Sequence, residues 1–177
     1  MFFSGHGTER NGQGYLVPID GSSNDPGTLI PLSWVKSTLE TSSANHRLLI
    51  LDACHSSAKA GDASSSPAKA MLSSLSGAAF ATLSSCDVSQ LSYEDKQAGH
   101  GVFTSAVIDG LSGTADKTAQ GNNDNVVNAT ELWAYAALKT KQWSVRTGKI
   151  QTPVLRGNFR GLIEITRFKS LQVKLTG

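Results

Sequence analysis

The sequence contains two short apolar runs, each followed by small and polar residues: residues 2–7, FFSGHG, and residues 48–56, LLILDACHS. Apolar runs of this kind predict buried parallel strands. In an open α/β sheet, reactive side chains gather just beyond the carboxyl ends of such strands. We therefore expect His6 and Cys54 to lie at the ends of two neighbouring strands, where a base would stand beside a thiol.

The composition is that of an ordinary globular protein. The chain has 177 residues, the size of one domain, and a net charge of +2 from scattered basic residues, so we expect no nucleic-acid or membrane surface. Two cysteines without a CxxC spacing favour a reducing, cytoplasmic location over a secreted disulfide framework. We expect no signal peptide and no membrane span.

Strand-like and helix-like segments alternate along the chain, which predicts an α/β fold with a mostly parallel sheet and helices on both faces. A turn-rich loop is expected at 7–14. Ser33 is expected to cap one helix, and residues 128–131, NATE, resemble a capping box that opens another. The expected strands are 1–5, 15–19, 48–51, 78–83, 162–166 and 171–175. The expected helices are 32–39, 71–75, 102–111 and one from the capping box at 128–131 to near Gly148.

The residue types at the two strand ends suit nucleophilic catalysis. A cysteine attacks a carbonyl as the thiolate, so its proton must be removed near neutral pH. His6 has the chemistry to take that proton and to return it to a departing amine. The backbone N–H groups of Gly7 and Cys54 are expected to stabilise the resulting oxyanion.

Six motifs in the same order resemble the caspase-like cysteine peptidases, most closely the metacaspase and bacterial caspase-homologue branch. The histidine of caspases precedes the cysteine by about 50 residues, an interval close to that from His6 to Cys54. The similarity covers most of residues 2–155. The motifs are SGHG (4–7), LVPID (16–20), DACHS (52–56), SSC (84–86), QLSYE (90–94) and HGVFT (100–104).

This resemblance implies the caspase–haemoglobinase fold and a catalytic dyad of His6, the base, and Cys54, the nucleophile. It implies a catalytic domain at 1–160, with a large-subunit-like part at 1–66 and a small-subunit-like part at 67–160. Residues 161–177 would form C-terminal strands or a tail. The family has further strands before the histidine-bearing one, so the chain is expected to be incomplete at its amino end, with the strand at 1–5 on an exposed edge.

The resemblance also suggests a substrate preference. Caspases carry Gln two residues before the cysteine, whereas this chain has Asp52. A carboxylate in the specificity pocket favours Arg or Lys, through charge-assisted and, for Arg, bidentate hydrogen bonds. Ser4 matches a family position that lines this pocket, and Asp87 or Glu94 would add negative charge.

No cofactor is expected. The paired aspartates of calcium-dependent metacaspases are missing from this chain, and a zinc site of Cys54, His55, Cys86 and His100 would lack the usual ligand spacing. We interpret Cys86 as a core or rim thiol and His100 as structural. The expected partners are protein or peptide substrates, with self-processing at Lys59, Lys69 or Lys117, or self-association, as further possibilities.

Two other function classes stay open. A caspase-like fragment without catalysis would serve as a scaffold or interaction module. An α/β ligand-binding domain has less support, because the chain has no GxGxxG or P-loop motif.

Overall fold

The centre of the protein is a six-stranded sheet with the order β3-β2-β1-β4-β5-β9. The computed structural model describes residues 1–55, 67–87, 90–95, 99–157 and 161–168, with the main chain alone at 54, 55, 67 and 68. The strands of the sheet are β1 (Phe2–Arg10), β2 (Gln13–Val17), β3 (Ile30–Pro31), β4 (Leu48–His55), β5 (Ala81–Ser84) and β9 (Val154–Arg156).

The sheet is mixed, which corrects the expectation of a mostly parallel one. Parallel pairing joins β1 to β4 and β4 to β5, whereas β2 pairs antiparallel with β1 and β3, and β9 pairs antiparallel with β5. The loop expected at 7–14 is instead a hairpin, in which Asn11 and Gly12 form a two-residue turn with φ of 53° and 79°. Such a short connection can join only antiparallel neighbours.

The exposed edge expected at residues 1–5 is present, but β1 continues beyond it. The second half of the strand, from His6 onward, pairs with β2 and lies inside the sheet. In the described part of the chain, Phe2–Gly5 pairs with β4 alone, and Phe2 is 49% exposed. The exposed edge is therefore confined to the first half of the strand.

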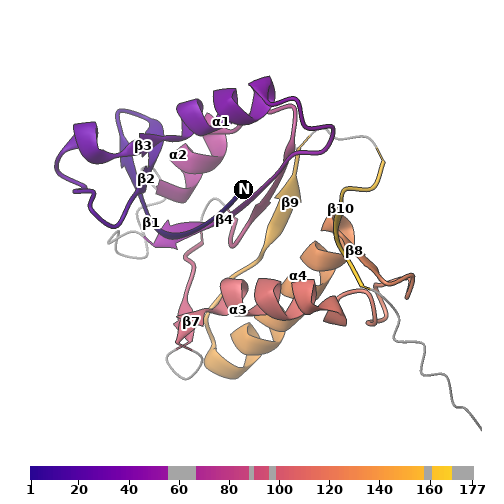
Figure 1. Ribbon diagram of the computed structural model, residues 1–177. Coiled ribbons are helices and arrows are strands. Elements are labelled where there is room, and N and C mark those ends of the chain that lie inside the picture. The colour runs from indigo at the N-terminus through magenta and orange to yellow at the C-terminus, as the bar shows by residue number, and fades with distance from the viewer. Residues whose placement is uncertain (56–66, 88–89, 96–98, 158–160, 169–177) are drawn as a thin grey trace, which may run out of the picture.

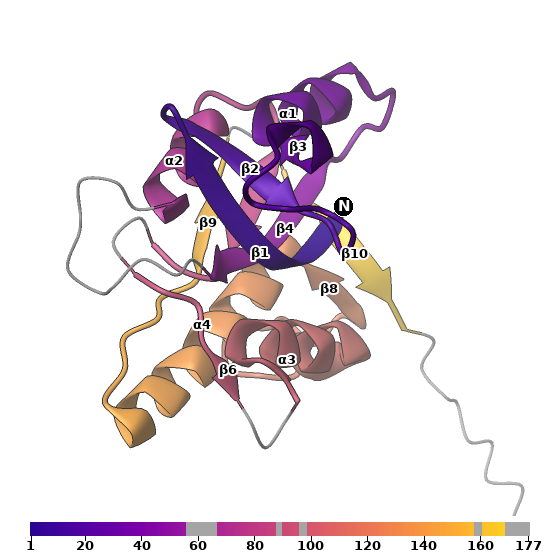
Figure 2. The same cartoon turned by 90° about the vertical axis from the view of Figure 1, so that its left-hand side faces the viewer.

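Alternate residues of β4 enter two separate apolar clusters. Leu49, Leu51 and Ala53 pack with α1 (Leu32–Thr41) and α2 (Pro67–Ser74), whereas Ile50 packs with α3 (Val102–Asp109) and α4 (Ala129–Thr147). Successive side chains of a strand point to opposite faces, so the two clusters lie on opposite faces of β4. Figures 1 and 2 show α1 and α2 on one side of the central strands and α3 and α4 on the other.

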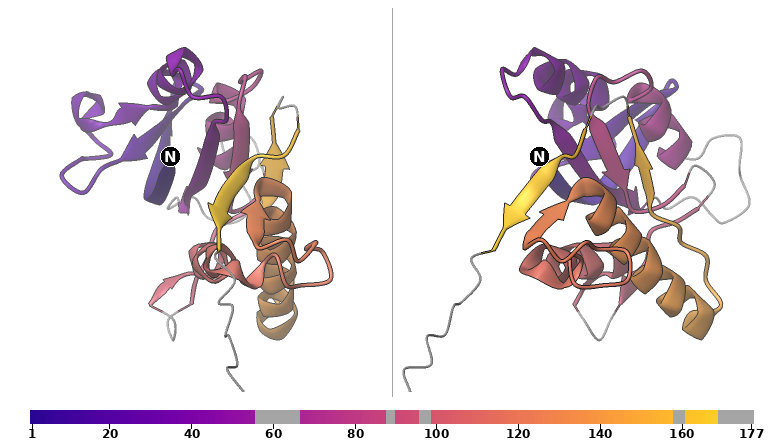
Figure 3. Two further views of the ribbon diagram at one scale, coloured as in Figure 1. Left: turned by 45° about the vertical axis from the view of Figure 1, so that its right-hand side comes forward. Right: turned by 90° about the vertical axis from the view of Figure 1, so that its right-hand side faces the viewer.

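The smaller elements complete the fold. Strand β10 lies beside β8 and pairs with it antiparallel (Figure 3), so the segment expected as a C-terminal strand or tail packs on the domain as far as residue 168. The strand expected at 171–175 and the processing site expected at Lys59 lie outside the described residues. The remaining short helices and strands of the described residues are η1 (Pro26–Thr28), β6 (Glu94–Asp95), β7 (His100–Gly101), η2 (Gly110–Thr114), β8 (Val126–Asn128) and β10 (Glu164–Arg167).

The expected helix signals are confirmed for α4 and differ for α1. The side chain of Asn128 accepts hydrogen bonds at the start of α4 and Glu131 completes the capping box, while Gly148 ends the helix with φ 71°. Helix α1 begins after Pro31 without a side-chain cap, so the role expected for Ser33 is wrong. No helix in the described ranges combines the length and the apolarity that a membrane crossing needs.

We expect Gly7→Ala to destabilise the fold, because Gly7 lies where β1, β4 and α2 meet. A Cβ there would lie 2.4 Å from the carbonyl oxygen of Ala53 and 2.5 Å from Sδ of Met71. Overpacking of this kind costs about 1–3 kcal/mol in the free energy of unfolding, which urea denaturation measures. Gly27→Ala is the control, since its Cβ meets only a side-chain oxygen of Asp25 at 3.2 Å. Equal midpoints for the two variants would contradict this packing.

We expect Tyr135→Phe to change how stability depends on alkaline pH. Burial, and then the hydrogen bond to the Asp109 carboxylate, raises the pKa of Tyr135 above its ordinary value of 10.0. The phenol contributes fully to the free energy of unfolding below pH 10.0. This contribution is lost as the pH rises toward the folded-state pKa, because Tyr135 deprotonates first in the unfolded chain. The difference in unfolding free energy between wild type and Tyr135→Phe should therefore become smaller above pH 10.0. A constant gap in urea melts across this range would contradict the assignment.

Candidate active site

The parallel pairing of β1 and β4 brings His6 next to the end of β4. The register matches Ser4 with Asp52 and His6 with His55, so two steps along β1 correspond to three along β4. The extra residue makes an irregularity of the bulge type, which re-aims side chains and is frequent beside active sites. The main chain of Cys54 lies within this irregular stretch, one residue from the partner of His6.

His6 differs from its expected place in one respect. It lies inside β1 and not after its end, but it is the last residue of β1 that pairs with β4. Its side chain is exposed. The side chain of Cys54 lies outside the described residues, so the sulfur–imidazole pairing stays a prediction.

Asp52 is fully buried, at 0% exposure, on the face of β4 that packs with α3. Both carboxylate oxygens accept a hydroxyl hydrogen bond: Ser92 Oγ donates at 2.6 Å and Thr104 Oγ1 at 2.5 Å. A Cβ at Gly101 would lie 2.6 Å from Oδ2 of Asp52, so only glycine lets the start of α3 approach this closely.

The negative charge of Asp52 has no cation beside it in the part of the chain that the structure describes. The ion pairs there join Arg156 to Asp87 and Arg167 to Glu164. Neutral donors offset part of the cost of burying a carboxylate but do not cancel its charge. The site therefore holds an uncompensated negative charge next to the end of the β1–β4 pair.

Ser4 connects this buried charge with the surface. Its side chain is exposed, and its Oγ lies 3.3 Å from Oγ1 of Thr104, which donates to Asp52. The structure therefore brings together Ser4 and Asp52, the two residues expected in one substrate pocket. Hydroxyl groups form the path from the exposed residue to the carboxylate.

Asp87, the other expected pocket residue, has a different environment. It follows β5 and pairs with Arg156 at 2.7 Å, with 41% of its side chain exposed. Glu94 is exposed on β6. The charge of Asp87 thus already has a cationic partner, in contrast to that of Asp52.

Gly7, expected in the oxyanion hole, is buried in β1 opposite Leu16 of β2. Cys86 is buried as expected, and its Sγ donates to the carbonyl oxygen of Gln90 at 3.3 Å. His100 precedes α3 on the short strand β7. Among the described residues, no group of three or more His, Cys, Asp or Glu side chains is arranged to hold a metal ion.

Three polar residues that support Asp52 were not among the expected site residues. These are Ser92 and Thr104, which donate to the carboxylate, and Gln151, whose Nε2 donates to Oγ of Ser92 at 3.1 Å. Thr104 belongs to the HGVFT motif, and this motif is the sequence signal that could have indicated its hydroxyl as part of the pocket. Gln151 lies in an irregular segment between α4 and β9, where no local pattern marks it.

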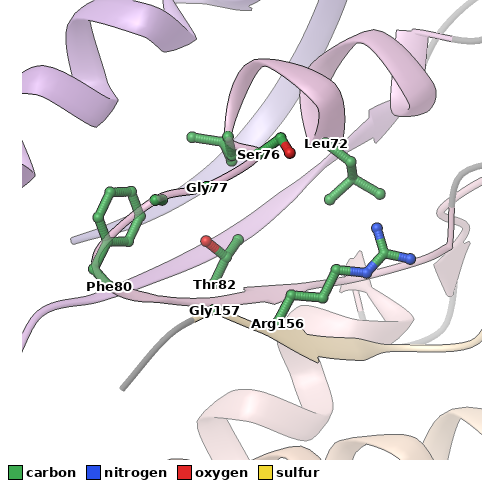
Figure 4. A pocket seen from close by; sticks show the side chains of 9 residues that line it. Leu72, Ser76, Gly77, Phe80, Thr82, Arg156 and Gly157 are labelled. Atoms are coloured by element: carbon green, nitrogen blue, oxygen red, sulfur yellow. The ribbon is translucent and has the colours of Figure 1, made fainter. Parts of the chain in front are cut away.

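Two cavities lined by described residues lie away from this site. A cavity of about 360 Å³ between α2 and the β5–β9 edge is lined by residues such as Leu72, Phe80 and Arg156 (Figure 4). A second, of about 250 Å³, lies between α3 and α4 around Trp143. The described lining residues of both cavities include none of the expected site residues.

We expect Thr104→Val to destabilise the protein, because it keeps the shape of the side chain but removes the donor to Oδ2 of Asp52. A buried acceptor left without its donor costs about 1–3 kcal/mol. Thr104→Ser keeps the hydroxyl and is the matched control. Urea denaturation measures both, and a valine variant as stable as the serine variant would show that this bond contributes nothing.

A comparison with known protein families gives one match. A family model described as the caspase domain, Peptidase_C14, matches residues 1–157, which is most of the chain. A search of curated proteins finds no match. The matched range includes β1, β4 and every residue in contact with Asp52. The chain therefore belongs to the caspase-domain family, peptidase family C14, which is a family of cysteine peptidases.

Proposed function

We propose that the protein is a metacaspase-type cysteine endopeptidase that cleaves peptide bonds after Arg or Lys. The observation that carries this proposal is the buried charge of Asp52, which has no cationic partner in the described part of the chain and lies beside the β1–β4 pair. Family membership supports the peptidase chemistry. The substrates would be proteins or peptides, including other copies of this chain.

The proposed chemistry uses His6 and Cys54 as base and nucleophile. His6 takes the thiol proton, and the thiolate attacks the carbonyl carbon of the scissile bond. Amides of Gly7 and Cys54 stabilise the oxyanion, and His6 then protonates the leaving amine as the C–N bond breaks. Water, deprotonated by His6, attacks the thioester, and the acid product leaves with the thiol restored.

The proposed recognition step uses Asp52 and Ser4. An Arg side chain would reach the carboxylate past Ser4 and Thr104, and its guanidinium would form a charge-assisted bond in a site of low dielectric constant. Asp87 would contribute less, because Arg156 already offsets its charge.

One observation favours the alternative of a non-catalytic scaffold. Asp52 has 0% exposure, so a substrate cation reaches it only if the side chains that cover it move. A chain in which these side chains stay in place would keep the fold and lose the pocket.

Cleavage of peptide reporters ending in Arg, Lys or Asp tests the proposal. We expect turnover of the Arg and Lys reporters but not of the Asp reporter. Turnover should disappear in Cys54→Ala, fall by about 10²–10⁴ in His6→Ala, and fall mainly through a higher KM in Asp52→Asn.

Labelling of Cys54 by iodoacetamide as a function of pH gives an independent measurement. A thiol that interacts with His6 should react at a lower pH in wild type than in His6→Ala. Identical labelling profiles, together with no turnover of any reporter, would favour the scaffold.

A further inference from the structure

We propose that Gln151 is a positioning residue that makes the Asp52 site select Arg over Lys. The inference rests on the proposed recognition of basic side chains by Asp52. Gln151 is buried, at 3% exposure, in the segment between α4 and β9. It does not contact Asp52, so it would act through Ser92.

The orientation of the Gln151 amide follows from two backbone groups that each have one possible role. The N–H of Tyr93 can only donate, and it donates to Oε1 at 2.9 Å. The carbonyl oxygen of Ser85 can only accept, and Nε2 donates to it at 3.1 Å. A flipped amide would place like groups together at both ends.

This fixed amide decides the direction of the Ser92 hydroxyl. Nε2 of Gln151 also donates to Oγ of Ser92, so this oxygen acts as an acceptor on that side. A serine hydroxyl carries one proton, and the Ser92 proton therefore goes to Oδ1 of Asp52 at 2.6 Å. Thr104 holds the other carboxylate oxygen at 2.5 Å, so the plane of the carboxylate is held from both sides.

The same segment holds the loop that carries Ser92. The N–H of Thr152 donates to Oε1 of Gln90 at 2.7 Å. Nζ of Lys149 lies 4.7 Å from the ring centre of Tyr93, and that ring lies 5.4 Å from the ring of Trp143. Contacts on both sides of Gln151 thus keep Ser92 within reach of Asp52.

A fixed carboxylate plane matters for one substrate side chain more than for the other. The planar guanidinium of Arg forms two parallel hydrogen bonds only when the carboxylate has the matching orientation. The ammonium group of Lys behaves as a point charge and tolerates a rotated carboxylate. Loss of the Gln151–Ser92 contact should therefore weaken the recognition of Arg and leave that of Lys nearly unchanged.

Equilibrium binding of peptide amides ending in Arg or Lys to the Cys54→Ala protein tests this without turnover. Gln151→Met keeps the length of the side chain but removes the amide. We expect this variant to bind the Arg peptide about tenfold more weakly, the scale of one hydrogen bond. Binding of the Lys peptide should weaken by less than about twofold. Gln142→Met, at an exposed position of α4, is the matched control and should change neither.

Ser92→Ala provides the second variant, because it removes the donor to Asp52 without touching the contacts of Gln151 with Tyr93 and Ser85. It should reproduce the Arg-specific loss, and Gln151→Met should add nothing further in the Ser92→Ala background. Equal losses of affinity for both peptides, or additive losses in the double variant, would overturn the positioning role. If Gln151→Met unfolds the loop, the Ser92→Ala variant alone still tests the Arg-specific loss.

The outcomes also separate this inference from the proposed function. If Gln151→Met behaves as expected in binding but wild-type protein shows no Cys54-dependent cleavage, the catalytic proposal fails and the positioning role stands. If Asp52→Asn abolishes binding of the Arg peptide and Gln151→Met does not alter it, the positioning role fails and the specificity proposal stands. If neither peptide binds the Cys54→Ala protein, the specificity proposal and the positioning role both fail.

Discussion

The site depends first on the parallel pairing of β1 with β4. Neighbouring strands of a sheet lie about 4.8 Å apart, so a ladder that reaches His6 brings it beside the end of the strand that carries Cys54. Hydrogen bonds extend this pairing to the first residue, since the amino group of Met1 donates to the carbonyl oxygen of Leu48. Strand β4 is in turn held by apolar clusters on both faces, which leaves it little freedom to slide.

The second constraint is electrostatic. A buried carboxylate in a protein is ordinarily paired with a cation or neutralised. Asp52 instead accepts bonds from two hydroxyl groups, which are weaker donors than a cation. The pair of Asp87 with Arg156 is different, because both side chains are more than two-fifths exposed and such pairs contribute little.

These two constraints come from different parts of the fold. Backbone pairing in the centre of the sheet sets the main-chain positions of His6 and Cys54. Side chains from the start of α3 and the loop after β5 contact Asp52, and the segment before β9 supports that loop. The matched family range extends through all of these segments. Asp52 itself lies on β4, but its hydrogen-bond partners lie outside β1 and β4, so a substitution of a partner would alter the surroundings of the carboxylate without changing either strand.

Sequence alone determined the features that depend on neighbouring residues. The apolar run at 48–51 predicted β4, the NATE segment predicted the start of α4, and six ordered motifs indicated the family that the comparison then found. Capping and apolar periodicity act within a few residues, so they are legible along the chain. The tertiary structure decided the hairpin that extends β1, the antiparallel outer strands and the contacts of Asp52 with Ser92 and Thr104. Those partners lie 40 and 52 residues from Asp52, and they meet it only because the loop after β5 and the start of α3 both pack against β4.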